Sequence, residues 1–125
     1  MIIRKIEEAR GTKRDVEFNA GRSVRLILEE DKMGFSFHVT EMEASVESYH
    51  WHYKHHLESC YCVSGKGVIT DLASGVSTVI TPGTIYILDN NDDHTFLPIE
   101  DTVLISVFNP PCKGSETHKE DGSYE

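Results

Sequence analysis

Short stretches of alternating apolar and polar residues make up most of the chain, and Gly, Pro, Asp or Asn separates each stretch from the next. Alternation with a period of two is typical of β-strands that bury one face. No stretch keeps the apolar spacing of an amphipathic helix for three turns. The pattern therefore predicts an all-β fold in a chain of 125 residues, which is the length of a single domain.

The predicted strands differ in length and share this alternation; they span residues 23–30, 34–42, 57–63, 68–72, 76–80, 84–88 and 102–108. Residues 65–67, Gly-Lys-Gly, predict a tight turn that joins the third and fourth of these strands as a hairpin. Residues 82–83, Pro-Gly, and the polar run 89–93 predict further turns. So many strands without covering helices favour a closed β-barrel or a double-sheet jelly roll, and such a barrel can hold one small ligand.

Acidic residues outnumber basic ones by 21 to 12, which gives a formal net charge of −9. A field of this sign repels a phosphate backbone, so nucleic acid is not an expected partner. No apolar run approaches the roughly 20 residues that span a bilayer, and residues 1–15 lack the apolar core of a signal peptide. We therefore expect no membrane partner and a cytoplasmic protein, whose cysteines, Cys60, Cys62 and Cys112, are reduced thiols.

Four of the seven histidines fall within residues 50–56. Imidazole is a good ligand for first-row divalent ions, so a metal site and a His-rich surface strand are both open interpretations. The spacing from Glu58 to Gly65 resembles the end of the first cupin motif, and that from Gly83 to His94 resembles the second. The two usual histidines of the first motif would stand at residues 51 and 53, or 52 and 54, and neither pair is two histidines. Only Glu58 and His94 remain as ligands by position.

Tyr86 is the candidate for a third ligand. It lies in the predicted strand 84–88, eight residues before His94. A bound cation stabilises a phenolate, which otherwise forms only near pH ~10. Carboxylate, phenol and imidazole suit iron better than structural zinc, which prefers sulfur and nitrogen ligands. The residues alone still favour a buried structural tyrosine.

Four segments carry a resemblance to the ectoine synthases, a family of small cupin enzymes. They are GFSF at 34–37 with Thr40, HYKHHLE at 52–58 with Tyr61 and Cys62, PGTIYILDNNDDH at 82–94, and HKEDGSY at 118–124. The resemblance runs nearly end to end, and a generic cupin lacks the last segment. It implies one cupin domain over residues 1–125, with residues 112–125 as a mobile lid over the barrel mouth. Composition alone would make this tail disordered.

The resemblance also implies an activity, namely closure of N-γ-acetyl-2,4-diaminobutyrate to the cyclic amidine ectoine with loss of water. Such an enzyme is a hydro-lyase that makes a compatible solute used under osmotic stress. The implied cofactor is iron, as Fe²⁺, with zinc or another divalent metal as alternatives. The implied ligands are Glu58, Tyr86 and His94, and the implied assembly is a homodimer.

Substrate-site positions of the family map onto six residues: Arg25, Thr40, Tyr53, Phe108, Glu116 and His118. Arg25 is expected to bind the substrate carboxylate through two hydrogen bonds. Tyr53, Glu116 and His118 are the expected catalytic residues, with Glu116 holding the amine and His118 moving a proton.

Without the resemblance, the alternatives for these residues stay open. Arg25 would be a solvated strand residue and Phe108 a core residue. Thr40 and Tyr53 could equally be pocket residues or ordinary strand residues whose hydroxyls face water. Histidines 50, 52, 55 and 56 are expected not to be ligands, although His55 is a candidate to support Glu58 from behind.

Three positions depart from the family pattern. Gly21 stands where Trp is common, His38 replaces an Asn, and Ser106 replaces a Cys. These positions lie on or beside substrate contacts in the family. Two alternatives to ectoine synthesis follow: a diverged cupin that acts on or hydrolyses a related N-acylated diamino acid or cyclic amidine, and a non-catalytic cupin that binds a small molecule.

Overall fold

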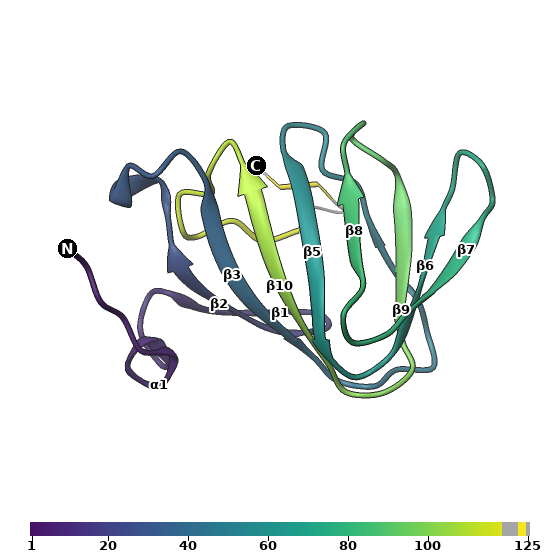
Figure 1. The fold of residues 1–125 in the computed structure, drawn as a ribbon, viewed down its shortest axis with the longest axis horizontal. Coiled ribbons are helices and arrows are strands. Elements are labelled where there is room, and N and C mark those ends of the chain that lie inside the picture. Colours follow the sequence, from purple (N-terminus) through teal and green to yellow (C-terminus); the bar gives the residue numbers. More distant parts are fainter. Residues whose placement is uncertain (119–122, 125) are drawn as a thin grey trace.

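Two antiparallel β-sheets form the barrel in the computed structural model, which describes residues 1–118 and 123–124 (Figure 1). The strand order is β1-β2-β3-β10-β5-β8 in the larger sheet and β4-β9-β6-β7 in the smaller. The all-β, double-sheet prediction is confirmed. The elements are α1 (Ile6–Ala9), β1 (Asp15–Phe18), β2 (Gly21–Ile27), η1 (Glu29–Asp31), β3 (Ser36–Met42), β4 (Tyr49–Trp51), β5 (Leu57–Ser64), β6 (Gly67–Asp71), β7 (Ser77–Ile80), β8 (Ile85–Leu88), β9 (His94–Pro98) and β10 (Thr102–Asn109).

All seven predicted strands are present, with ends that differ by up to three residues. The largest difference is in β2, which ends at Ile27 because the 3-10 helix η1 follows it. Three strands, β1, β4 and β9, and the one-turn helix α1 were not predicted. Three or four residues show too little alternation to be recognised, and β9 ends in Pro98, a residue that argues against a strand. Within residues 1–118 and 123–124, no helix is long and apolar enough to cross a bilayer.

The predicted hairpin at residues 65–67 is wrong, although the turn itself is present. Strand β5 pairs with β10 and β8, whereas β6 pairs with β7 and β9, so the chain changes sheets at this turn. A Cβ on Gly65, whose φ is +89°, would lie 2.2 Å from the carbonyl oxygen of Asp101. Glycine is required here because two loops pack closely, and this requirement gives the same sequence signal as a hairpin turn.

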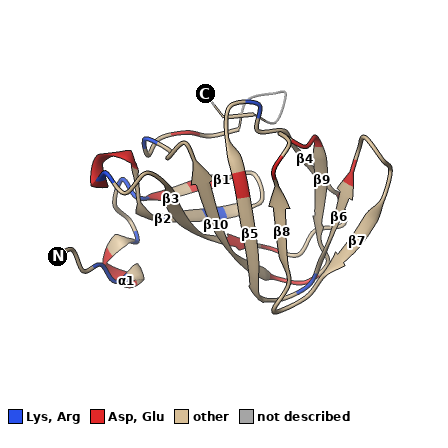
Figure 2. Ribbon diagram, turned by 45° about the horizontal axis from the view of Figure 1, so that its top comes forward, with Lys and Arg blue, Asp and Glu red and all other residues tan. Residues whose placement is uncertain are grey.

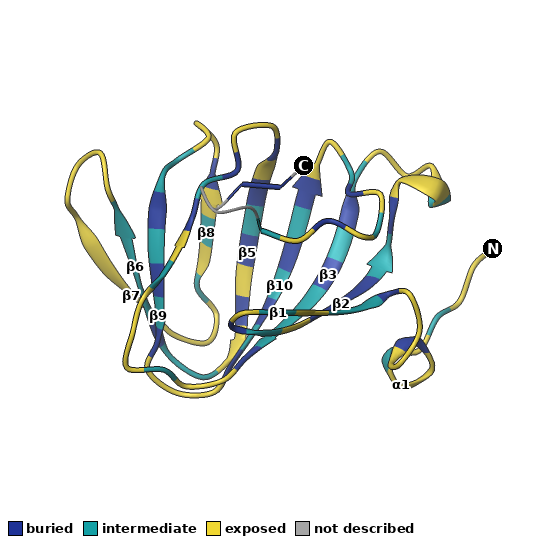
Figure 3. Ribbon diagram, turned by 180° about the vertical axis from the view of Figure 1, so that it is seen from behind, coloured by how far each residue is buried: buried dark blue, intermediate teal, exposed yellow. Residues whose placement is uncertain are grey.

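Strand β3 turns mainly polar side chains toward the barrel interior. Ser36 and His38 are buried, and Thr40 lines the barrel cavity. The alternate residues, Phe37 and Val39, lie on the outer face and are half-buried. Figure 3 shows the same alternation of buried and exposed positions along β5. Polar inward side chains are suited to a barrel that encloses a polar ligand.

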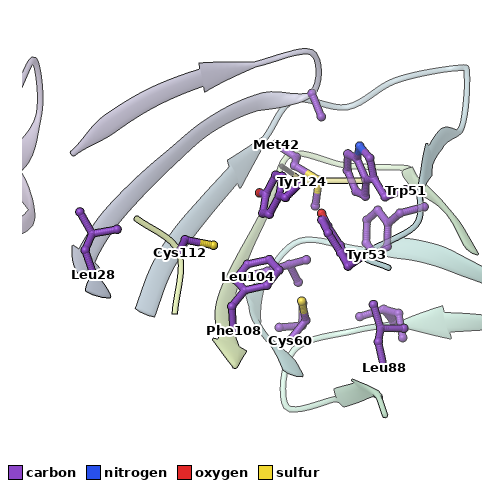
Figure 4. Close-up of a cluster of buried hydrophobic side chains, with 14 residues drawn as sticks. Leu28, Met42, Trp51, Tyr53, Cys60, Leu88, Leu104, Phe108, Cys112 and Tyr124 are labelled. Atoms are coloured by element: carbon purple, nitrogen blue, oxygen red, sulfur yellow. The ribbon is translucent and has the colours of Figure 1, made fainter. Parts of the chain in front are cut away.

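The C-terminal segment contributes to the buried core between the sheets. Figure 4 shows Cys112 and Tyr124 among the apolar side chains of this core, with Tyr124 close to Met42 and Tyr53. Cys112 is fully buried and Tyr124 is 5% exposed. The disorder that composition predicts for the tail therefore does not hold for its described part, residues 112–118 and 123–124. Residues 119–122 and 125 of the predicted lid lie outside the described residues.

One buried carboxylate ties the turn after β2 to the N-terminal region. Asp31 accepts hydrogen bonds from both terminal nitrogens of Arg4, at 3.0 and 2.7 Å, and from the backbone N–H of Leu28 at 3.0 Å. Arg14 adds a longer bond of 3.4 Å. The hydrogen bonds from Arg4 hold the pKa of Asp31 below its ordinary value. A bidentate, largely buried pair of this kind stabilises the fold more than a surface ion pair does.

We expect the Asp31→Asn substitution to lower the free energy of unfolding by about 2 kcal/mol at neutral pH, because it removes the charge from a buried hydrogen-bonded pair. Since the folded-state pKa is lowered, this stabilisation is complete above the unfolded-state pKa, near 4, and is lost as the pH falls through the folded-state pKa. Urea unfolding of both proteins, from neutral pH into the acid range, checks this.

The exposed Glu29 belongs to the same turn, and Glu29→Gln is the control, with an expected change below about 0.5 kcal/mol. A difference between wild type and Asp31→Asn that does not shrink in acid would contradict the linkage.

Candidate functional site

A small cavity of about 20 Å³ lies inside the barrel, which is room for about one water molecule. Six of the nine predicted site residues line it: Thr40, Tyr53, Glu58, Tyr86, Phe108 and His118. The other three, Arg25, His94 and Glu116, are buried residues that contact this lining or the tail that covers it. The structure thus brings together residues drawn from six strands, the loop between β4 and β5, and the C-terminal segment.

Glu58 and Tyr86 lie on neighbouring strands of one inner face. Glu58 on β5 is directly opposite Leu88 on β8, and Tyr86 lies two residues before Leu88. The side chains of Glu58 and Tyr86 are therefore diagonal neighbours. Burial raises the pKa of Glu58 to about 8 and that of Tyr86 well above its ordinary value. No ion pair of Glu58 with a basic side chain is present within the described part of the chain. A cation between these two acids would relieve the cost of burying them.

His94 begins β9 on the opposite sheet, and its ring lies 6.1 Å from that of Tyr53. Its Nδ1 is 2.9 Å from the carbonyl oxygen of Asp92, which can only accept, so Nδ1 carries the proton. Its Nε2 is buried and has no hydrogen-bond partner among residues 1–118 and 123–124. An imidazole oriented in this way offers an unprotonated nitrogen, as metal-binding histidines do. With Glu58 and Tyr86, the donor set fits a divalent first-row ion.

Arg25 is buried, at 1% exposure, and is not the solvated strand residue that composition favours. Its terminal nitrogens donate to the carbonyl oxygens of Gly114, at 3.0 Å, and Glu116, at 2.6 Å. Its Nε donates to Ser23 at 3.2 Å, and the guanidinium lies 5.7 Å from the ring centre of Tyr124. The guanidinium therefore holds the C-terminal segment against the barrel. The expected carboxylate-binding group is engaged by the protein's own backbone.

Glu116 is buried within the same segment. Its carboxylate accepts hydrogen bonds from the backbone N–H groups of Lys113, at 2.6 Å, and Gly114, at 2.8 Å, and lies 3.7 Å from Arg25. Burial acts to raise the pKa of Glu116, but the backbone N–H groups and Arg25 outweigh it, so the pKa is lowered. Glu116 is thus held as an anion beside Arg25.

His118 closes the cavity from the tail side. Its Nε2 lies 2.7 Å from the hydroxyl of Tyr53. Its ring stacks on Trp51, at 5.1 Å between centroids, and on Tyr124, at 4.8 Å. Burial, followed by the charge of Arg25, lowers the pKa of His118 to about 3, so the imidazole is neutral in this closed arrangement.

Thr40, Tyr53 and Phe108 also face inward. The hydroxyl of Thr40 is 3.0 Å from that of Ser106. Tyr53 is 4% exposed, and its ring packs edge-on against Phe108 at 5.2 Å. Burial raises the pKa of Tyr53 well above its ordinary value, so the phenol keeps its proton. All three residues line the cavity, and Phe108 is also part of the buried core.

The four clustered histidines have different surroundings. His50 is exposed and pairs with Asp93, and His52 lies 3.8 Å from the same carboxylate. His55 is also exposed, whereas Glu58 is buried and its pKa is affected by hydrogen bonds from Cys60 and Ser106 rather than by His55. His56 is the one buried histidine of the four.

The three departures from the family pattern have different structural consequences. A Cβ on Gly21 would lie 2.0 Å from the carbonyl oxygen of Glu41, so the close approach of β3 excludes any side chain there. Aromatic lining is nevertheless present, because Phe18 and Trp51 both line the cavity. His38 is buried between two serines, and Ser106 lines the cavity.

Sequence reasoning missed several lining residues, among them Phe18, Ser23, Trp51 and Tyr124. Trp51 lies in the histidine-rich stretch 50–56, and Tyr124 lies in the segment 118–124 that carries the family resemblance. Their positions in these two segments could have identified them as site residues. Phe18 lies in the unpredicted strand β1, and Ser23 shares an inward face with Arg25. Residues two apart in a strand point to the same side, so Ser23 could have been identified once Arg25 was known to point inward.

A two-sheet antiparallel barrel with ligand-type side chains on its inner face is the architecture of the cupins. A cupin 2 conserved barrel domain protein from Salinispora arenicola shares the fold, with a TM-score of 0.67 at 19% identity over 86% of this chain and 87% of that one. The chain belongs to the ectoine synthase family, whose model matches residues 1–125.

Relatives within this family are similar over their whole length. The L-ectoine synthase of Desulfosudis oleivorans is 49% identical over 126 residues, covering 100% of this chain and 97% of that protein. That of Hahella chejuensis is 45% identical over 124 residues, covering 99% and 93%. The crystal structure of ectoine synthase from P. lautus matches with a TM-score of 0.86 at 38% identity, over 91% of this chain and 81% of that one.

We expect Arg25→Lys to speed hydrogen exchange of the backbone amides of residues 113–118 by about tenfold, because lysine cannot hold both tail carbonyls in the same geometry. Exchange of the β10 amides should stay unchanged, and mass spectrometry of peptides from both regions measures the two effects. Arg22 lies on the same strand, is exposed and pairs with Asp15, so Arg22→Lys is the matched control. Equal exchange of the tail in both variants would show that Arg25 does not hold it.

Proposed function

We propose that this protein closes N-γ-acetyl-2,4-diaminobutyrate to ectoine and releases water, as a hydro-lyase. The match of the family model to residues 1–125 supports this activity. The observation that supports it most is geometric: six of the nine predicted site residues line one buried cavity, and the other three are buried. A buried, convergent set of ionisable residues is typical of a catalytic site.

Arg25 and Glu116 are suited to hold the two charged ends of the substrate. The planar guanidinium of Arg25 binds two oxygens that lie side by side, now those of the tail and in the complex those of the substrate carboxylate. Glu116 is an anion beside it and suits the α-amino group. Fixing both groups folds the substrate so that its amine approaches its own acetamide carbon, which supplies the proximity that ring closure needs.

Tyr53 and His118 form the pair that we assign to proton transfer. The amine must lose a proton before it attacks, and the leaving oxygen must gain protons to depart as water. Neutral His118 can accept a proton, and the phenol of Tyr53, 2.7 Å away, can relay one. The rings of Trp51 and Tyr124 against His118 exclude water from this pair, which favours dehydration.

We assign Glu58, Tyr86 and His94 as the residues that hold the metal. Their buried acids and the unpartnered Nε2 of His94 support this assignment. An oxygen-rich set with one imidazole favours iron, as Fe²⁺, over a closed zinc site. When bound, such an ion supplies Lewis acidity that makes the amide carbonyl more electrophilic.

The C-terminal segment is proposed to be a lid. The cavity of about 20 Å³ is far too small for the substrate, and the tail occupies Arg25 and Tyr53, two groups that the substrate needs. The segment must therefore open for entry, and closing it over the substrate would exclude water. We place the enzyme in the cytoplasm, where its free and buried cysteines stay reduced, and where its product would serve as a compatible solute under osmotic stress.

The direct test is to incubate the Fe²⁺-loaded protein with N-γ-acetyl-2,4-diaminobutyrate and to follow ectoine by chromatography. We expect turnover by the wild type and a loss of about 100-fold or more in Glu58→Ala, Tyr86→Ala and His94→Ala, because each removes one ligand. His50→Ala removes an exposed histidine and should retain activity. Ring opening of ectoine without synthesis would favour the hydrolytic alternative, and binding without product would favour a non-catalytic cupin.

A homodimer is proposed from the outer face of the larger sheet. Tyr61, Val63, Ile85 and Ile87 lie side by side on β5 and β8 and are between 45% and 59% exposed. Figure 2 shows that β8, β9 and β10 carry no charged residues. Strand β8 is also one of the two edge strands of its sheet. For a chain of net charge −9, an uncharged apolar face is where a second copy can approach with least repulsion.

We expect Ile85→Asp to convert the dimer to a monomer, because it buries a charge in the proposed interface. Size-exclusion chromatography with light scattering measures the mass. Val46, which is 98% exposed and lies in the loop between β3 and β4, provides the control Val46→Asp, with no expected change in mass. A wild-type monomer, or a dimer that survives Ile85→Asp, would contradict the proposal.

A further inference from the structure

Three metal-ligating side chains meet outside the Glu58, Tyr86 and His94 set. They are His56, in the loop between β4 and β5, and Cys112 and Glu116, in the segment after β10. An imidazole nitrogen, the thiol sulfur and a carboxylate oxygen all lie within 4.8 Å of one another. The residues are 6%, 0% and 8% exposed. Two side chains of the C-terminal segment and one from a loop more than 50 residues earlier in the chain are thus gathered at one buried point.

The donor set has the composition that zinc prefers. Zinc takes thiolate, imidazole and carboxylate ligands in tetrahedral geometry, with bonds of about 2.0–2.3 Å, so its ligand atoms lie about 3.5 Å apart. A separation within 4.8 Å requires the three side chains to move inward by about 1 Å, which rotamer adjustments achieve. The ordinary hard-ion alternatives, calcium and magnesium, do not take a thiolate.

Each of the three groups has capacity left for a ligand. Nδ1 of His56 is buried and has no hydrogen-bond partner within residues 1–118 and 123–124. Each carboxylate oxygen of Glu116 accepts one backbone hydrogen bond and keeps a second lone pair. Burial raises the pKa of Cys112 to about 12, so its thiol is neutral until a metal displaces the proton. A buried imidazole without a partner costs free energy, and a metal would remove that cost.

We propose that His56, Cys112 and Glu116 form a second, zinc-binding site that fastens the C-terminal segment to the loop between β4 and β5. Water would complete the tetrahedral coordination. The ion cross-links two parts of the chain that must separate when the lid opens, and it engages the carboxylate assigned to the substrate amine. Zinc at this point therefore holds the closed form and competes with substrate.

The test uses metal binding rather than turnover, so that it is independent of the proposed activity. Glu58→Ala/His94→Ala protein, in which the first site is removed, is titrated with Co²⁺ as a spectroscopic substitute for zinc. We expect one equivalent to bind with a sulfur-to-cobalt charge-transfer band, and Zn²⁺ to displace it. Adding Cys112→Ser should abolish the band, and adding His56→Gln should weaken binding at least about tenfold.

Two other buried cysteines provide matched controls. Cys60 lies beside Glu58 and Tyr86, and Cys62 follows it on β5. Cys60→Ser and Cys62→Ser should both retain the band. Loss of the band in Cys60→Ser, its persistence in Cys112→Ser, or the absence of any sulfur band in the starting protein would overturn the proposal.

A measurement on the unmutated thiols covers the case in which Cys112→Ser does not fold. Zn²⁺ should slow alkylation of Cys112 by iodoacetamide at least about tenfold, as read by mass spectrometry. It should also slow hydrogen exchange of residues 113–118, because the ion fixes their segment. Alkylation and exchange that are the same with and without Zn²⁺ would show that no ion binds there.

Discussion

Buried polar groups inside the barrel impose the constraint on which the other features depend. Arg25, His38, Glu58 and His94 are each at most 6% exposed. An uncompensated charge or polar group in such a position costs several kcal/mol, so each needs a partner. Arg25 finds its partners in tail carbonyls, and His38 finds them in two serines. Glu58 has hydrogen bonds from Cys60 and Ser106 but no ion pair with a basic side chain, and Nε2 of His94 has no hydrogen-bond partner, within the described part of the chain; this is why we assign the metal there.

A chain of hydrogen bonds carries this constraint from β2 to the tail. Arg25 donates to Ser23, Ser23 lies 3.3 Å from Nδ1 of His38, and Nε2 of His38 lies 3.1 Å from Ser36. Ser36 then accepts the backbone N–H of Cys112 at 2.9 Å. Burial, followed by the charge of Arg25, holds the pKa of His38 well below its ordinary value, so it is neutral and can both donate and accept. The departure at position 38 is therefore satisfied by its own surroundings.

Period-two alternation was sufficient to predict the all-β fold and seven of the strands, because each strand has distinct inner and outer faces. It could not tell which face is inner: the polar residues Ser36 and His38 turned out to be buried, which depends on the tail and on partners distant in sequence. The alternation also could not predict which strands pair with each other. The turn at Gly65 shows this, because a glycine that is required by a closely packed loop cannot be told in sequence from one that is required by a hairpin. The burial of Arg25 has the same origin, since its partners, Gly114 and Glu116, are 89 and 91 residues away.

Under the proposed assignment, the tail and the substrate need the same groups, and this gives the closed structure a physical meaning. In the closed form, carbonyls of residues 114 and 116 bind the guanidinium of Arg25, and His118 binds the hydroxyl of Tyr53. A substrate carboxylate would bring a full negative charge to Arg25, whereas a carbonyl brings only a dipole, so the bond in which both partners are charged is the stronger one. Substrate can therefore displace the carbonyls without leaving Arg25 unpaired. In the proposed lid, this difference between a charge and a dipole lets the tail separate from Arg25 when a substrate with a carboxylate arrives.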